Sequence, residues 1–413
     1  MNLTQTIALR LSSLSVYRGV LEQPVPKALC HLLAAVESAA QSPAAFYEAW
    51  GALFSALCRE KGEVSLSGCL TQAALLDENP YSVACAAGQS VSPLLERAAR
   101  RDLALLREAG TLLPQDFWTA AGLDGTCDLP EWECGEPVEP LRGELDSCMA
   151  QLPAYYRAHG CGIYARYRAF IWRDHAIQPV EFVDPTRLSD LKGYEYPRGL
   201  VVDNTRSFLQ GLPANNCLLY GDRGTGKSST VKAVLNEYAG QGLRVIEMPK
   251  ESLMDFPRLV NRIAGLPMKF LIFIDDLSFS RQDDTYAALK AVLEGGVAAR
   301  PANTLIYATS NRRHLLRETF SDREGDEVHR GDTIQESLSL ADRFGLAVAF
   351  QQPDKARFLE LVRALACERG LEEHLPEIER GAEAWALQRG GRSPRCAKQY
   401  IQDYEGRLKR TQP

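Results

Sequence analysis

The feature that most constrains the fold is a glycine-rich octapeptide, Gly-Asp-Arg-Gly-Thr-Gly-Lys-Ser, at residues 221–228. It fits the pattern G-x-x-x-x-G-K-[ST] at every fixed position, and an apolar segment suited to a strand comes directly before it. Glycines let the backbone N–H groups of such a loop turn inward around an anion, which side chains would obstruct. The pattern therefore predicts a phosphate-binding loop between a strand and a helix, with Lys227 on the β- and γ-phosphates and the Ser228 hydroxyl on Mg²⁺.

A second apolar run, at residues 270–274, ends in the pair Asp275-Asp276. Apolar residues on both faces of such a strand imply helices on both sides of the sheet. Carboxylates at the carboxyl end of a parallel strand lie at the edge where ligands bind. We therefore expect Asp275 to hold Mg²⁺ through water, and Asp276 to orient or activate the attacking water.

Short apolar runs alternate with helical patterns after about residue 181, which favours a parallel sheet covered by helices. The runs lie at residues 217–220, 244–248, 270–274, 304–308 and 346–350. No strand is evident after residue 353. We expect an α/β nucleotide-binding domain at residues 181–352 and a small helical domain at residues 353–413.

Residues 1–180 are expected to form a mainly helical domain, because apolar residues recur there at three- and four-residue spacing between Pro-containing breakers. An acidic stretch rich in Gly and Pro, residues 122–143, is expected to be a linker or a surface excursion. Residues 144–180 read as helical and hold aromatic side chains mixed with arginines, which either stack bases or pack a domain interface. The 10 basic and 19 acidic side chains of residues 1–150 favour packing and disfavour nucleic acid as a partner.

Signals for other compartments and cofactors are missing from the sequence. The chain has no apolar stretch near the length of a membrane span, and its first residues lack the apolar run of a signal peptide. No two of the 11 cysteines form a C-x-x-C pair. We expect a cytoplasmic protein with reduced cysteines and no membrane partner.

With both motifs identified, the order of elements over residues 181–405 resembles the AAA+ ATPases. The resemblance implies a parallel five-stranded P-loop core with helices on both faces, a C-terminal helical lid and an N-terminal mainly helical domain. Residues 305–311, Leu-Ile-Tyr-Ala-Thr-Ser-Asn, are similar to the sensor 1 strand. This implies that Asn311 contacts the γ-phosphate and the attacking water, with Thr309 and Ser310 as less favoured substitutes.

Three further segments are similar to AAA+ landmarks. Residues 339–345, Ser-Leu-Ala-Asp-Arg-Phe-Gly, resemble box VII, which implies that Arg343 is the arginine finger in a neighbouring subunit's site. Residues 392–398 resemble the start of the sensor 2 helix, which makes Arg395 the arginine that reaches the γ-phosphate of its own chain. Residues 190–194 resemble the segment that packs on adenine and bring Tyr194 to the site. A planar guanidinium suits the first two roles because it binds phosphoryl oxygens bidentately.

A closer resemblance is to a family of bacterial AAA+ proteins without an assigned cellular role. It rests on the stretches Gly-Leu-Pro-Ala-Asn-Asn at residues 211–216 and Asn-Glu-Tyr at residues 236–238, which flank the phosphate loop. Two departures from the wider superfamily affect the function. Asp276 replaces the usual Glu, as in some initiators and helicase loaders that turn over slowly, and residues 250–256 lack the aromatic-hydrophobic-Gly tripeptide of unfoldase pore loops. The charged residues 322–330 are expected to form a mobile surface loop, and contact with a neighbouring subunit or a partner is the alternative.

These observations lead to an Mg²⁺-dependent ATPase that acts as a homo-oligomeric ring or spiral and remodels or loads a macromolecular partner, recognised by the N-terminal helices. Two alternatives stay open. One is an ATP-dependent assembly switch with negligible hydrolysis. The other is a DNA-linked loader or initiator, which the basic residues between 392 and 410 favour. The expected catalytic residues are Asp276, Asn311, Arg343 and Arg395, and the expected metal ligands are Ser228 and Asp275. The residues expected to bind ATP are Gly221, Asp222, Arg223, Gly224, Thr225, Gly226, Lys227, Ser228, Ser229 and Tyr194.

Overall fold

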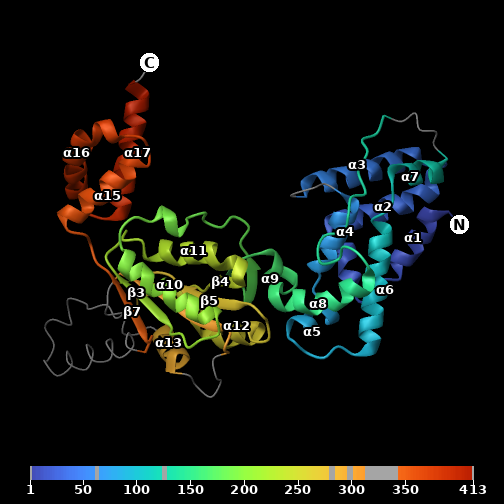
Figure 1. Ribbon diagram of the computed structural model, residues 1–413, viewed down its shortest axis with the longest axis horizontal. Helices are drawn as coiled ribbons and strands as arrows, with labels where there is room; N and C mark the ends of the chain where they lie inside the picture. The colour runs from blue at the N-terminus through green and yellow to red at the C-terminus, as the bar shows by residue number, and fades with distance from the viewer. Residues whose placement is uncertain are drawn as a thin grey trace. The chain divides into compact units, whose positions relative to one another are not determined.

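The structure is a computed structural model of the 413-residue chain, and it describes residues 2–60, 65–122, 128–278, 284–294, 301–311 and 343–411. The chain forms two compact units, Met1–Arg166 and Tyr167–Pro413 (Figure 1). The first unit ends before the expected boundary at residue 180, because the residues in between join the sheet of the second unit. No helix in the described ranges is long and apolar enough to cross a membrane.

The first unit is helical, as predicted. Several of its helices begin at the prolines that mark breaks in the sequence, since the first turn of a helix does not need the N–H group that proline lacks. Its elements are α1 (Leu3–Ser12), the 3₁₀ helix η1 (Arg18–Glu22), α2 (Pro24–Ser38), α3 (Pro43–Arg59), α4 (Leu66–Leu75), α5 (Pro80–Ala86), α6 (Pro93–Ala109), α7 (Pro114–Ala121), α8 (Leu145–His159) and α9 (Gly162–Arg166).

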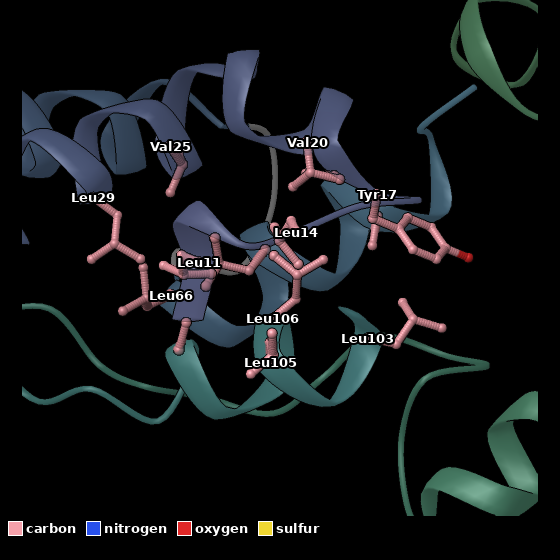
Figure 2. Close-up of a cluster of buried hydrophobic side chains, with 14 of the residues drawn as sticks. Leu11, Leu14, Tyr17, Val20, Val25, Leu29, Leu66, Leu103, Leu105 and Leu106 are labelled. Atoms are coloured by element: carbon pink, nitrogen blue, oxygen red, sulfur yellow. The ribbon is translucent and has the colours of Figure 1, made fainter. Parts of the chain in front are cut away.

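The core of this unit joins its helices around aliphatic and aromatic side chains. Figure 2 shows side chains from α1, α2, α4 and α6 converging with those of the segment after α1. A buried carboxylate fixes that segment. Asp102 of α6 is 0% exposed, and its Oδ2 accepts the backbone N–H groups of Ser15, Val16 and Tyr17 at 2.8, 2.7 and 3.2 Å. The carboxylate thus gives three backbone donors a partner, and buried donors without one are costly.

The prediction that residues 144–180 are helical throughout is wrong after Arg166. The chain there forms a hairpin of β1 (Ala169–Arg173) and β2 (Ala176–Pro179). Asp174 and His175 link the strands in the left-handed conformation (φ 52° and 56°) that two-residue hairpin turns require. Trp172 is only 1% exposed and donates its indole N–H to Asp255 at 3.1 Å. A ring buried in this way cannot stack on a base, so its role here is packing.

The second unit is built on a mostly parallel sheet with the order β2-β1-β4-β5-β6-β3-β7. Its five predicted parallel strands are confirmed, and the hairpin β1–β2 adds two strands that the prediction lacked, because β1 pairs in parallel with β4. These five strands are β3 (Cys217–Gly221), β4 (Leu243–Glu247), β5 (Lys269–Ile274), β6 (Thr304–Ser310) and β7 (Leu346–Phe350).

Helices cover both faces of this sheet (Figure 1). One face packs on α10 (Glu195–Leu209) and α11 (Lys227–Tyr238) through an apolar cluster. From β4 the chain returns along the sheet through β5 and β6, opposite to its step from β3 to β4. Right-handed crossovers therefore place α12 (Phe256–Ile263) and α13 (Asp284–Glu294) on the other face. Three short 3₁₀ helices lie in the connections of this unit: η2 (Leu188–Asp190), η3 (Ala239–Gln241) and η4 (Lys250–Asp255).

The chain ends in three helices that share a small apolar core, as the sequence predicts. They are α15 (Lys355–Cys367), α16 (Leu375–Gln388) and α17 (Pro394–Thr411), with the 3₁₀ helix η6 (Glu372–His374) between the first two. We call residues 353–411 the lid. The mostly parallel sheet, the helices on both of its faces and the helical lid confirm the predicted α/β fold class.

Candidate functional site

The phosphate loop has the backbone conformation that its sequence predicts. Gly221, Gly224 and Gly226 have φ values of 133°, 77° and 94°, which favour glycine. A Cβ atom on Gly221 would lie 2.2 Å from the carbonyl oxygen of Phe350, so β7 also requires glycine at this position. Helix α11 begins at Lys227 directly after the loop and points its N-terminus at the site. This arrangement suits an anion.

Lys227 lies inside the loop, where its ammonium donates hydrogen bonds to neighbouring oxygens. Its Nζ donates to the carbonyl oxygens of Gly221 and Asp222 at 2.8 and 2.7 Å, and to Oδ1 of Asn311 at 3.3 Å. Burial lowers the pKa of the Lys227 ammonium, and the negative charge of Asp222 opposes this shift. Only 7% of the residue is exposed, so a buried cation is held at the centre of the loop.

The two acidic residues after β5 lie beside this loop. Oδ1 of Asp275 accepts hydrogen bonds from the hydroxyl of Ser228 at 2.6 Å and from the hydroxyl of Thr309 at 2.5 Å. Asp276 accepts from the amide of Asn311 at 2.5 Å and has a left-handed backbone (φ 52°). Such strain at a non-glycine residue is concentrated at functional sites.

Thr309 has a larger part in this network than its secondary rank in the sequence suggested. Its hydroxyl donates to Asp275 and accepts the backbone N–H of Asp276 at 2.9 Å, so one buried oxygen positions both acidic residues. Asn311 contacts both Lys227 and Asp276. The end of β6 therefore supplies two polar side chains to the site.

Replacing Thr309 by Val should destabilise the chain by about 1–3 kcal/mol, because the isosteric side chain leaves the N–H of Asp276 and a carboxylate oxygen of Asp275 without this partner. Urea unfolding followed by circular dichroism measures the effect. Thr304→Val is the matched control at the buried start of the same strand, where the hydroxyl makes one long bond (3.3 Å) to Asn303. Equal effects of the two substitutions would contradict a special role for Thr309.

Two aromatic side chains, Tyr194 and Phe350, also line the site. The ring of Tyr194 stacks on that of Phe350, with centroids 5.6 Å apart and planes at 19°, and its hydroxyl donates to the Gln351 carbonyl at 2.6 Å. Burial raises the pKa of Tyr194 to about 12, with a smaller contribution from the charge of Asp222. The phenol is therefore neutral over the physiological range and offers a flat apolar wall.

The lid touches the phosphate loop directly. The backbone N–H of Arg395 donates to the Gly224 carbonyl at 3.2 Å. A Cβ atom on Gly224 would lie 3.0 Å from the Ser393 hydroxyl and 3.1 Å from Cβ of Arg395. The first turn of α17 thus rests on the loop, and only a glycine allows this approach.

A cleft of about 890 Å³ runs along the phosphate loop, the two acidic residues, Tyr194 and the first turns of α17. Most of the predicted residues line it, whereas Gly221, Asp222 and Arg343 do not. The Asp222 carboxylate instead accepts the backbone N–H of Gln352 at 2.8 Å, between β7 and the lid. The predicted residues that line the cleft are Tyr194, Arg223, Gly224, Thr225, Gly226, Lys227, Ser228, Ser229, Asp275, Asp276, Asn311 and Arg395.

Several lining residues were not among the predicted site residues. Lys398 lies one helical turn after Arg395, a spacing that the sequence displays and that places both on one face of a helix. Phe350, Leu361 and Leu365 supply apolar surface, and only the three-dimensional packing of β7 and α15 brings them to the cleft.

Two predicted features lie wholly or partly outside the described residues. The charged segment 322–330 is one, and residues 339–342 of the box VII match are the other. Arg343 itself is described and partly buried. Its role in a neighbouring subunit stays a prediction.

Most of the six basic residues between 392 and 410 that favoured a DNA-linked protein have a hydrogen-bond or ion-pair partner. Arg392 pairs with Glu383, and Arg407 with Asp403 at 2.9 Å. Lys409 pairs with a carboxylate of the same helix, and Arg410 donates to a backbone carbonyl. Three of these six cations therefore pair with a carboxylate, and the DNA-linked alternative stays a prediction.

A comparison with protein families identifies the chain. A family model described as "Protein of unknown function (DUF815)" matches residues 165–408. The chain belongs to this family. The match covers the hairpin, the parallel sheet, the phosphate loop and nearly all of the lid, so the whole cleft lies within the matched part of the chain.

Some solved structures are distantly similar to part of the chain. A mutant of RuvB from Thermotoga maritima is 14% identical, with a TM-score of 0.38, over 56% of this chain and 69% of that one. AMPPCP-bound DnaA from Aquifex aeolicus is 19% identical, with a TM-score of 0.39, over 56% of this chain and 70% of that one.

The residues of the cleft fit Mg²⁺ and a nucleoside triphosphate. The Ser228 hydroxyl and the Asp275 carboxylate, 2.6 Å apart, are the hard oxygen ligands that Mg²⁺ prefers. The loop N-terminal to α11, together with Lys227, suits phosphate oxygens, and the Tyr194 side suits a flat base.

Proposed function

We propose that this protein binds ATP with Mg²⁺ in the cleft and hydrolyses it. The observation that carries the proposal is the convergence of Lys227, Ser228, Asp275, Asp276 and Asn311 within one hydrogen-bonded network. An ammonium inside an anion loop, beside two carboxylates that do not pair with it directly, is an arrangement for holding phosphate and metal charge together.

Each residue has a separate task in this proposal. Lys227 and the loop N–H groups bind the phosphates, while Ser228 and Asp275 hold the metal, directly or through water. When bound, Mg²⁺ neutralises charge on the phosphate oxygens. Asp276 orients the attacking water and accepts its proton, and the Asn311 amide fixes the carboxylate of Asp276. Arg395 approaches from the lid as a further cation at the phosphates.

The proposal extends to assembly. Arg343 is proposed to complete the site of a neighbouring copy, so that the protein works as a ring or spiral, and the helical first unit is proposed to recognise a macromolecular partner. An alternative is a switch in which ATP binding alone changes assembly. The bond between Asn311 and Asp276, and an acidic side chain one methylene shorter than the usual Glu, favour that alternative.

The test of this function is ATP turnover per chain as a function of protein concentration, with wild type and Arg343→Ala. The motor proposal predicts a specific rate that rises steeply with concentration and a loss of that rise in the variant. Tight ATP binding with no turnover at any concentration would contradict hydrolysis and support the switch.

A further inference from the structure

Two cations of the lid face the phosphate loop without a partner in the part of the chain that the structure describes. Arg395 and Lys398 are exposed residues of the first turns of α17, and both line the cleft. Their side chains make no hydrogen bond or ion pair within the described ranges. The charge of Arg395 is also close enough to Lys227 to lower the pKa of that ammonium.

The remaining cations of α17 each have a hydrogen-bond acceptor within the helix. Arg407 pairs with Asp403 and Lys409 with Glu405, at 2.9 and 2.7 Å, and Arg410 donates to the Gly406 carbonyl at 3.1 Å. The helix thus provides acceptors for its distal cations and, within the described ranges, none for the two at the cleft.

This arrangement carries an energetic cost when no anion is present. Residues three apart on a helix are neighbours, and like charges at that spacing repel each other. The contact of the Arg395 N–H with Gly224, together with the tight fit of Ser393 against the same glycine, holds this face of α17 at the loop. An anion shared by both side chains would remove the repulsion.

We propose that Lys398 is a second phosphate-binding residue of the lid, which contacts the terminal phosphate of the bound triphosphate beside Arg395. The inference rests on the proposed function of the same cleft. It makes the lid responsible for distinguishing a triphosphate from a diphosphate, since a ligand without the terminal phosphate leaves the two cations unpaired again.

Calorimetric titration of the full chain with AMPPCP and with ADP, both in Mg²⁺, tests this proposal. Lys398→Ala should raise the Kd for AMPPCP about tenfold, which is the loss expected for one charge-assisted hydrogen bond. The Kd for ADP should rise by less than about threefold. Lys398→Arg should restore most of the AMPPCP affinity. Lys409→Ala is the matched control, because it removes a paired lysine of the same helix that does not line the cleft.

The outcomes separate this inference from the proposed function. If Lys227→Ala loses both nucleotides while Lys398→Ala binds AMPPCP like wild type, the role of Lys398 is wrong and the nucleotide site stands. An equal loss of AMPPCP and ADP in Lys398→Ala would also overturn the terminal-phosphate assignment. If Lys227→Ala binds both nucleotides like wild type, the proposed function itself is wrong.

Discussion

Replacing Asp276 by Asn should lower the turnover number for ATP by about 10²- to 10⁴-fold, the usual contribution of a positioned general base. Asparagine tolerates the left-handed backbone of this position, and its amide oxygen can still accept the hydrogen bond from Asn311. The substitution therefore removes the proton acceptor with little change in shape. ATP affinity should stay the same or increase, because a negative charge next to the phosphates is lost.

Steady-state phosphate release and a separate binding titration measure the two effects. Asp203→Asn is the control, since Asp203 is exposed on α10, lies 4.0 Å from Arg206 and does not line the cleft. Turnover that survives in Asp276→Asn would contradict the role of this carboxylate as the base.

Lys227→Ala should raise the Kd for ATP by at least about 100-fold. The ammonium is buried and is oriented by two loop carbonyls, so its charge-assisted bonds to phosphate oxygens need little reorganisation on binding. Removing them costs about 3 kcal/mol, which corresponds to that change in Kd.

The matched control is Lys232→Ala on the same helix. Lys232 lies 3.4 Å from Asp184 in an exposed ion pair, which contributes little to stability or to the cleft. The affinity of the Lys232→Ala variant for ATP should equal that of wild type. A thermal unfolding scan of both variants without nucleotide shows whether the chain has kept its fold. Equal ATP affinities of the two variants, in folded chains, would contradict the phosphate-binding role of Lys227.

The phosphate loop and the acidic pair of the site could be predicted because the residues of each lie close together in the sequence. The glycines, Lys227 and Ser228 lie within one octapeptide, and Asp275-Asp276 ends a short apolar run that fits a buried strand. Their positions relative to each other follow from the edge that parallel strands share.

The features that the sequence did not reveal depend on contacts between distant segments. The stacking of Tyr194 on Phe350 joins residues that are far apart in the chain, and Lys398 reaches the cleft only because α17 packs on Gly224. The hairpin after Arg166 was missed for another reason. Its aromatic and basic residues fit a helical pattern as well as a strand, and the pairing with β4 decides between them.

The most direct test of the account is a calorimetric titration of the full wild-type chain with AMPPCP, with Mg²⁺ and after its removal by a chelator. Binding of one nucleotide per chain is predicted, with an affinity that falls without the metal, because Ser228 and Asp275 would then have no ion to share with the phosphates. A titration that shows no saturable binding in the presence of Mg²⁺ would contradict the assignment of this cleft as an ATP site.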